Sequence, residues 1–249
     1  MQMKKDIHLT SRDLLDMVQL RPEDVGKYAI VPGPKDRLEV LIKKLENPVR
    51  NFSFMEYAMY TGYLDGIKVT AINGGRFSPD TAITTEILCG AGIKNIIRIG
   101  SCGALREDIK VGDLVLATGS VRGDGVTPYY VTSDFVTVSD KGLNGIMTEL
   151  INASGIKVHT GAVWTTDALL RETREKVNEA VSRAAIAVDM VSSTFLTICQ
   201  MNKVKATAIL SVSDNIITGE LGFMNPLFYR AESATIDLAL NTVRKLEGK

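Results

Sequence analysis

The chain has 249 residues, 45% of them apolar, and its 29 basic side chains equal its 29 acidic ones in number. A core-forming composition without net charge argues against a general nucleic-acid binder or a basic membrane-surface protein, but leaves room for a local basic pocket. The cysteines Cys89, Cys102 and Cys199 form no paired spacing that suggests a zinc site. Their odd number, with no apolar leader and no membrane-length apolar run, predicts a cytoplasmic protein without membrane contact.

The first half of the chain alternates between strand-like and helix-like segments. Asp65-Gly66 is a strong two-residue turn between two alternating runs, and Gly92 is a suitable helix end. The strand that contains Arg98 is expected to stop at Gly100-Ser101-Cys102-Gly103. In order, we expect a strand at 27–33, a helix at 36–47, a hairpin at 57–73, a helix at 79–92 and a strand at 94–99.

The second half continues the same alternation. We expect a strand at 112–118, a helix at 141–155, a strand at 156–166, a helix at 171–184, a strand at 185–190, a helix at 192–203, a strand at 205–214 and a helix at 232–247. This order predicts an α/β fold, a three-layer sandwich in which helices flank a mixed, mostly parallel central sheet. No linker, low-complexity segment or repeat interrupts it, so we expect a single domain over residues 1–249.

Arg98 is the residue that fits its strand least well. It interrupts the apolar run "IIRIG", and a guanidinium in a buried strand is costly unless an anion meets it. Loops that follow strands hold ligands in such folds, and here they combine arginines with glycines, as phosphate sites do. Phosphate and a structural carboxylate are equally good partners on spacing alone. Neither a P-loop nor a dinucleotide fingerprint is present to support nucleotide binding.

Five segments resemble, in order and spacing, the uridine and purine nucleoside phosphorylase family. They are "AIVPGPKDRLEVL", "IIRIGSCGALREDIKVGDLVLATGSVRGDG", "WTTDALLRETRE", "VDMVSSTFLT" and "LSVSDNIITGE". The resemblance implies that inorganic phosphate, as co-substrate, attacks C1′ of a nucleoside and that free base and ribose 1-phosphate leave. It implies no metal and no organic cofactor. It also implies a homo-oligomer, from dimer to hexamer, whose active sites are shared between subunits.

The resemblance also implies a phosphate-binding set. Gly33 corresponds to a backbone donor and Arg37 to a guanidinium in the loop after the first strand. Arg98 and Ser101 correspond to a second arginine and a hydroxyl donor. Phosphate thereby becomes the expected partner of Arg98.

Ribose and base contacts follow from the same resemblance. His8 corresponds to a histidine that reaches the ribose 5′-hydroxyl of a neighbouring subunit, and Met190 to a methionine that packs on the ribose. Asp214 corresponds to the aspartate that protonates purine N7 as the base leaves; the alternative is that it caps the following turn. Arg171 and Arg174 are candidates for a pyrimidine edge, with surface charge at a helix start as the alternative. His159 is expected to be structural.

Three departures from the family pattern lie in the site. Val191 stands where the family has the carboxylate that binds the ribose 2′- and 3′-hydroxyls, and Met55 where it has a third phosphate arginine. Bulky residues also replace glycines in the loop over 75–80.

Arg76 is the candidate to compensate for the missing arginine, and Asp189 or Asp80 for the missing carboxylate. The departures leave three hypotheses open. The chain is a phosphorylase of altered specificity, a nucleosidase that uses water, or a weakly active relative that keeps the fold as a ligand-binding oligomer.

Overall fold

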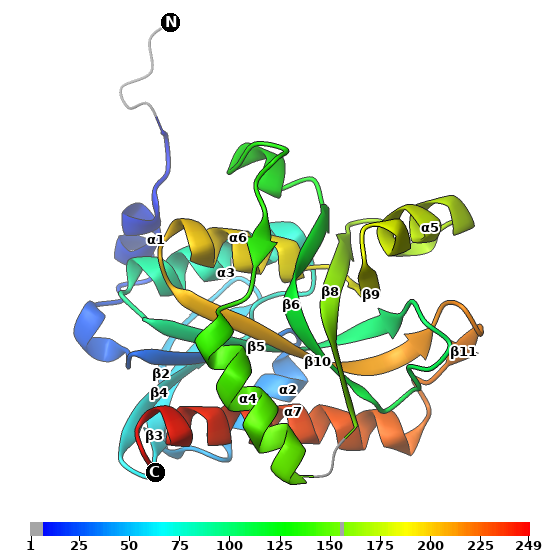
Figure 1. Ribbon diagram of the computed structural model, residues 1–249. Coiled ribbons are helices and arrows are strands. Elements are labelled where there is room, and N and C mark those ends of the chain that lie inside the picture. The colour runs from blue at the N-terminus through cyan, green and yellow to red at the C-terminus, as the bar shows by residue number, and fades with distance from the viewer. Residues whose placement is uncertain (1–6, 155–156) are drawn as a thin grey trace, which may run out of the picture.

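A mixed sheet forms the centre of the molecule (Figure 1). The computed structural model describes residues 7–154 and 157–249. Its strands are β1 (Tyr28–Pro32), β2 (Glu46–Phe54), β3 (Tyr57–Leu64), β4 (Ile67–Ile72), β5 (Asn95–Ala104), β6 (Leu114–Gly123), β7 (Thr137–Val138), β8 (Val158–Thr166), β9 (Ala185–Asp189), β10 (Lys205–Asn215) and β11 (Glu220–Leu221).

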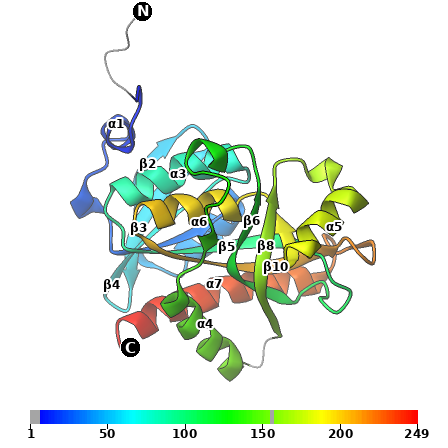
Figure 2. The same ribbon diagram turned by 45° about the horizontal axis from the view of Figure 1, so that its top comes forward.

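Helices cover both faces of this sheet, as the alternation of segments predicts. They are α1 (Ser11–Met17), α2 (Lys35–Ile42), α3 (Ser78–Gly90), α4 (Lys141–Ser154), α5 (Arg174–Ser182), α6 (Ser192–Met201) and α7 (Pro226–Leu246), with short 3₁₀ turns η1 (Pro22–Asp24), η2 (Thr127–Tyr129) and η3 (Leu169–Arg171). Figures 1 and 2 show α1, α3 and α6 on one face, and α4 and α7 on the other. The predicted α/β sandwich is confirmed. No helix within the described ranges is long and apolar enough to cross a bilayer.

The sheet is parallel at its centre and closes on itself at one side. β4, β1, β5 and β10 run parallel, while β3 and β2 continue antiparallel to the edge. On the other side β10 pairs with β6, β6 with β8, β8 with β9, and β9 returns to β5. This closure brings the ends of β5, β9 and β10 together, and the order of segments in the sequence gives no sign of it.

Both faces of the central strands are buried. In β5, Ile97 and Ile99 face the core beneath α7, whereas Ile96 faces the core beneath α3 and α6. In β1, Ile30 faces the core beneath α7 and Val31 faces the core beneath α3 and α6. Successive side chains of a strand point to opposite faces, so two covered faces require an uninterrupted apolar run, which is the pattern that identified these strands.

The prediction that the strand ends at Gly100 is wrong, because β5 continues to Ala104 through the glycines. A Cβ on Gly100 would lie 2.7 Å from the Leu210 side chain, and one on Gly103 would lie 2.9 Å from a carboxylate oxygen of Asp214. These glycines therefore serve close packing of β10 against β5 rather than a turn. The expected hairpin is confirmed, with its turn at Asp65 and Gly66.

Two other expected segments differ from the structure. The helix expected at 36–47 ends at Ile42, and β2 follows it as an edge strand paired with β3. The terminal helix begins at Pro226 rather than at residue 232, with the Asn225 side chain capping the first turn. The expected boundary at 155–156 lies outside the described residues.

Candidate active site

A cavity of about 370 Å³ opens where β1, β5, β9 and β10 end. Loops that follow parallel strands meet at this edge, which is where such folds hold ligands. Its lining joins basic, acidic and apolar side chains from segments far apart in the chain. The lining residues are Gly33, Pro34, Arg37, Arg76, Arg98, Ser101, Cys102, Gly103, Leu169, Glu172, Val188, Asp189, Met190, Val191, Ser213, Asp214 and Phe223.

Arg98 lies in this lining as a buried cation without a counter-ion. The residue is 4% exposed, and neither Nε nor Nη1 has a hydrogen-bond partner among the described residues. Burial lowers the pKa of Arg98 to about 10; the Asp189 carboxylate opposes this effect and the Arg37 guanidinium adds to it. A guanidinium held in this way is suited to an anion that enters the cavity.

Arg37 lies beside Arg98 and is held by two neighbouring elements. Its Nη1 donates to the carbonyl oxygen of Ile99 over 3.1 Å, and its Nη2 forms an ion pair with Glu232 of α7. Its Nε is buried without a partner within the described part of the chain. Gly33 completes this corner, since a Cβ there would lie 4.0 Å from Nη2 of Arg98. The first turn of α2 and the middle of β5 thus build one cationic wall.

A third guanidinium comes from the loop between β4 and α3. Arg76 lines the cavity, and its Cζ lies 5.8 Å from the centre of the Phe77 ring. Met55 is 70% exposed in the turn between β2 and β3, outside the cavity lining. Arg76 thus adds a third guanidinium to this lining, and its compensation for Met55 stays a prediction.

Asp189 lines the cavity, but its oxygens are already occupied. Oδ1 accepts hydrogen bonds from Thr165 Oγ1 at 2.9 Å and from the backbone N–H groups of Val191 and Ser192. Oδ2 accepts from the Ser192 hydroxyl at 2.6 Å. The carboxylate thus fixes the start of α6. Val191 and Met190 follow it in the lining, so this wall is largely apolar.

Asp214 lies at the far end of β10, just after an irregularity in its pairing with β5. Its Oδ1 accepts a 2.7 Å hydrogen bond from the Ser213 hydroxyl. The turn that follows is capped by Asn215, whose Oδ1 accepts from the backbone N–H groups of Ile217 and Thr218. Asp214 is not used in that turn and faces the cavity instead.

Glu172 brings a second carboxyl to the same end of the cavity. It follows η3, and Leu169 of η3 and Phe223 line the wall with it. Burial raises the pKa of Glu172 to about 7, and the negative charge of Asp214 contributes in the same direction. Glu172 therefore takes up a proton close to neutral pH.

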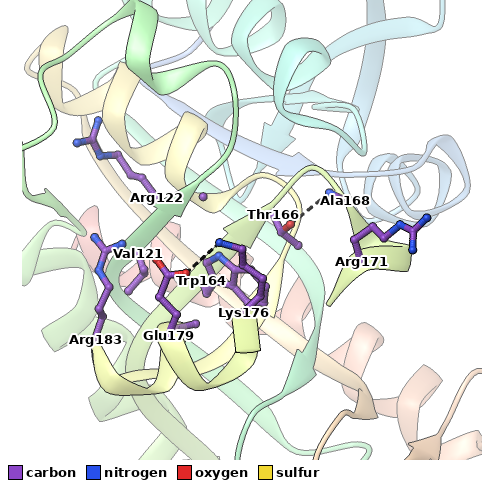
Figure 3. Close-up of a pocket in the computed structure, with 11 residues that line it drawn as sticks. Val121, Arg122, Trp164, Thr166, Ala168, Arg171, Lys176, Glu179 and Arg183 are labelled. Atoms are coloured by element: carbon purple, nitrogen blue, oxygen red, sulfur yellow. Dashed lines mark hydrogen bonds and ion pairs between the residues drawn. The ribbon is translucent and has the colours of Figure 1, made fainter. Parts of the chain in front are cut away.

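Several residues singled out from the sequence lie outside the cavity lining. His8 is exposed ahead of α1, and Arg174 is exposed at the start of α5. Arg171 borders a separate hollow beside Trp164, where its side chain extends away from the Lys176–Glu179 ion pair (Figure 3).

Two further expectations concern residues that take part in local hydrogen bonds. Asp80 accepts a 3.0 Å hydrogen bond from the Tyr57 hydroxyl and does not line the cavity, so it does not stand in for the missing carboxylate there. His159 is structural as predicted, with Nε2 2.9 Å from Asp113 Oδ2.

The comparison with protein families agrees with this arrangement. The family model for the phosphorylase superfamily matches residues 27–240. The chain belongs to the phosphorylase superfamily. It is 29% identical to guanosine phosphorylase from Halorubrum lacusprofundi over 79% of this chain and 81% of that protein. It is 27% identical to uridine phosphorylase from Salmonella typhimurium over 89% and 92%.

A solved structure shows the same fold over almost the whole chain. Purine nucleoside phosphorylase from Toxoplasma gondii superposes with a TM-score of 0.85, covering 99% of this chain and 98% of that one at 22% identity. The resemblance drawn from the sequence motifs is confirmed at the level of the family.

Sequence reasoning about this phosphorylase superfamily member missed two residues. Glu172 lies in the charged run "RETRE", which is typical of a solvated helix start. Glu232 lies within α7, and only the fold brings it to Arg37. The one available signal was the apolar pair Leu169-Leu170 just before Glu172, which is unusual in a solvated turn.

Proposed function

We propose that the chain cleaves nucleosides with inorganic phosphate, giving free base and ribose 1-phosphate. The observation that carries the proposal is Arg98, a buried guanidinium whose Nε and Nη1 have no hydrogen-bond partner among the described residues and which shares its cavity with Arg37 and Arg76. Water as nucleophile needs no such set of cations, so these arginines favour a phosphorylase over a nucleosidase.

The cationic wall holds the phosphate in this proposal. The N–H of Gly33, the guanidiniums of Arg37 and Arg98 and the hydroxyl of Ser101 bind its oxygens, and Arg76 adds a third guanidinium. Fixing phosphate against C1′ saves the entropy of bringing the reactants together. Its charge also stabilises the oxocarbenium character that develops on the ribose as the bond to the base breaks.

The ribose lies between the two ends of the cavity, against Met190 and Val191. Asp189 was a candidate ribose ligand, but its hydrogen bonds to α6 favour a role in holding Met190 and Val191 in place. His8 reaches a ribose only if a second copy of the chain lies against the cavity. We therefore retain a homo-oligomer with shared sites as part of the proposal.

Asp214 faces the base and gives its proton to N7 of a purine as the base leaves. Capping of the following turn by Asn215 supports this role over the structural alternative. Arg171 and Arg174 take no part in base binding here, because neither lines the cavity. The proposal needs phosphate as co-substrate and no cofactor. A cytoplasmic location stays a prediction.

A panel of uridine, inosine, adenosine and methylthioadenosine, each with and without phosphate, tests the function. We expect base release that requires phosphate and that yields ribose 1-phosphate (or its methylthio derivative). Release that is equally fast without phosphate would establish a nucleosidase. No release from any substrate, with phosphate binding retained, would establish the ligand-binding alternative.

A further inference from the structure

The cavity has two ends of opposite charge, and the register of β5 and β10 measures how far apart they lie. Arg98 is level with Ala208, whereas Gly103 is level with Asp214. The Arg98 side chain reaches along the strand, since a Cβ on Gly100 would lie 3.2 Å from its Nη2, so the guanidinium lies about three residues of β5, or roughly 10 Å, from the level of Gly103. A nucleoside is long enough to bridge such ends, with phosphate at the arginines and the base at the carboxyls.

The acidic end consists of two carboxyls without a cationic partner. Within the described ranges, neither Asp214 nor Glu172 forms an ion pair, and the only hydrogen bond to either carboxyl is donated by the Ser213 hydroxyl. Asp214 is presented by the end of β10 and Glu172 by the turn after η3; both line the cavity, and the charge of Asp214 acts on Glu172. The apolar side chains of Leu169 and Phe223 line the cavity with them. Two carboxyls in one partly apolar wall do not both ionise readily.

We propose that Glu172 is a positioning residue for the reaction, which shares one proton with Asp214 and so keeps the base-facing end of the cavity protonated when a purine leaves. This inference rests on the proposed function. It explains why a glutamate with no structural contact of its own points into the cavity. The proton belongs to the pair rather than to either carboxyl.

The pKa of Glu172 is shifted in the direction that this arrangement of carboxyls requires. Burial raises its pKa to about 7, with the Asp214 carboxylate as the second cause. Glu172 is therefore about half protonated near pH 7 and mostly protonated just below it, where an isolated exposed glutamate has already lost its proton. The other charged or titratable groups on the cavity wall are Arg37, Arg76, Arg98, Cys102 and Asp189.

The proton transfer balances without any further reactant. A phosphate oxygen forms the bond to C1′ as the bond from C1′ to N9 of the purine breaks. The electron pair of that bond stays with the base, and the shared proton moves from the carboxyl pair to N7. A neutral purine departs, and the pair regains its proton from solvent. Uracil has no N7, so its departure does not use this proton.

The first experiment follows the carboxyl groups directly. Wild-type protein with ¹³C-labelled glutamate side-chain carboxyls is titrated by NMR, and Glu172→Gln assigns the Glu172 signal. We expect a midpoint near 7 in the wild type. In Asp214→Asn we expect it about one pH unit lower, because the charge of Asp214 is gone while burial remains. A wild-type midpoint below 5, or a midpoint that Asp214→Asn leaves unchanged, would overturn the inference.

The second experiment connects the pair to catalysis. In Glu172→Gln we expect purine nucleoside phosphorolysis at pH 6.5, where most of Glu172 is protonated in the wild type, to fall about tenfold, with the alkaline fall of kcat/KM moved to lower pH. Uridine cleavage should change less than about twofold, since it does not draw on this proton. Glu175→Gln, an exposed glutamate of α5 outside the lining, is the matched control and should behave as wild type.

The outcomes separate the two proposals. Equal slowing of purine and uridine cleavage in Glu172→Gln, or an unchanged pH profile, would overturn the inference and leave phosphorolysis standing. Failure of the wild type to cleave any nucleoside would overturn the proposed function and with it the catalytic role of the pair. The NMR titration would then still decide whether Glu172 and Asp214 share a proton.

Discussion

The two ends of the cavity are built from different kinds of structure. The cationic end rests on β1 and β5 in the middle of the sheet, where Arg98 is 4% exposed. The acidic end is closed by loop residues such as Leu169 and Phe223, which are 57% and 54% exposed. Strands hold an anion site rigidly, whereas loops tolerate substitution and movement. Under the proposed function, phosphate binding would be the fixed part of the site and base recognition the variable part.

The same contrast explains what the sequence could predict about the site. Arg98 breaks the apolar pattern of its strand, and a residue that violates a local rule at high cost marks a functional position. Glu172 violates no local rule, because a glutamate in a charged run is ordinary. Its significance depends on the position of η3 relative to the end of β10, which no local pattern specifies.

The largest effect expected at the cationic end follows from Arg98→Met. Loss of charged hydrogen bonds to phosphate should weaken its binding about 1,000-fold, measured by calorimetry. Thermal stability should rise, because a buried guanidinium without a counter-ion is replaced by an apolar side chain. Arg106→Met, which breaks only the exposed pair with Asp108, is the control. Unchanged phosphate affinity with the fold intact would remove Arg98 from the site.

The largest effect expected at the acidic end follows from Asp214→Asn. Purine nucleoside cleavage should slow about 100-fold, because an amide cannot give its proton to N7. Uridine cleavage should slow only a few-fold. Steady-state kinetics with inosine and uridine at saturating phosphate measure the two effects. Equal slowing of both substrates, or a loss of thermal stability alone, would assign Asp214 a structural role.

A smaller effect is expected from Glu232→Gln, which removes the counter-ion of Arg37 but keeps a hydrogen-bond acceptor. Unfolding free energy should fall by about 1–3 kcal/mol, measured with urea, because the mostly buried Arg37 loses its ion pair. Phosphate affinity should fall about threefold, since Ile99 still orients the guanidinium. An affinity loss as large as that of Arg98→Met would show that the two arginines depend on Glu232 as one unit.

The fold was more predictable from the sequence than the site, and the segments that were predicted wrongly have physical explanations. The apolar runs of β1, β5 and β10 identify strands because both faces of the sheet are covered. The sequence did not reveal β2 because its first five residues are exposed. Within the described residues it pairs with β3 alone, so pairing rather than composition makes it a strand. The start of α7 was marked by Asn225-Pro226, a cap followed by proline at the first helical position. That earlier start places Glu232 beside Arg37.

The smallest effect expected is a pH-dependent difference in stability between wild type and Glu172→Gln. The pKa of Glu172 is raised from its usual 4.5 to about 7 in the folded chain. Between these values the folded chain holds a proton that the unfolded chain has lost, so unfolding releases it and rising pH favours unfolding. Below pH 4.5 both states are protonated and no cost arises. Above pH 7 the full cost of burying the charge is present.

Glu172→Gln removes this cost, and its stability relative to wild type should therefore increase with pH. Between pH 5 and pH 8 we expect a gain on the order of 2 kcal/mol, less than full burial would give, because part of the side chain faces solvent in the cavity. Urea unfolding at four pH values measures this stability difference. Glu175→Gln is the control, and its stability relative to wild type should not change with pH. A difference that stays constant with pH would mean that Glu172 is ionised as easily in the folded chain as in the unfolded one. The acidic end would then hold two independent carboxylates, and its contrast with the cationic end would be one of charge alone.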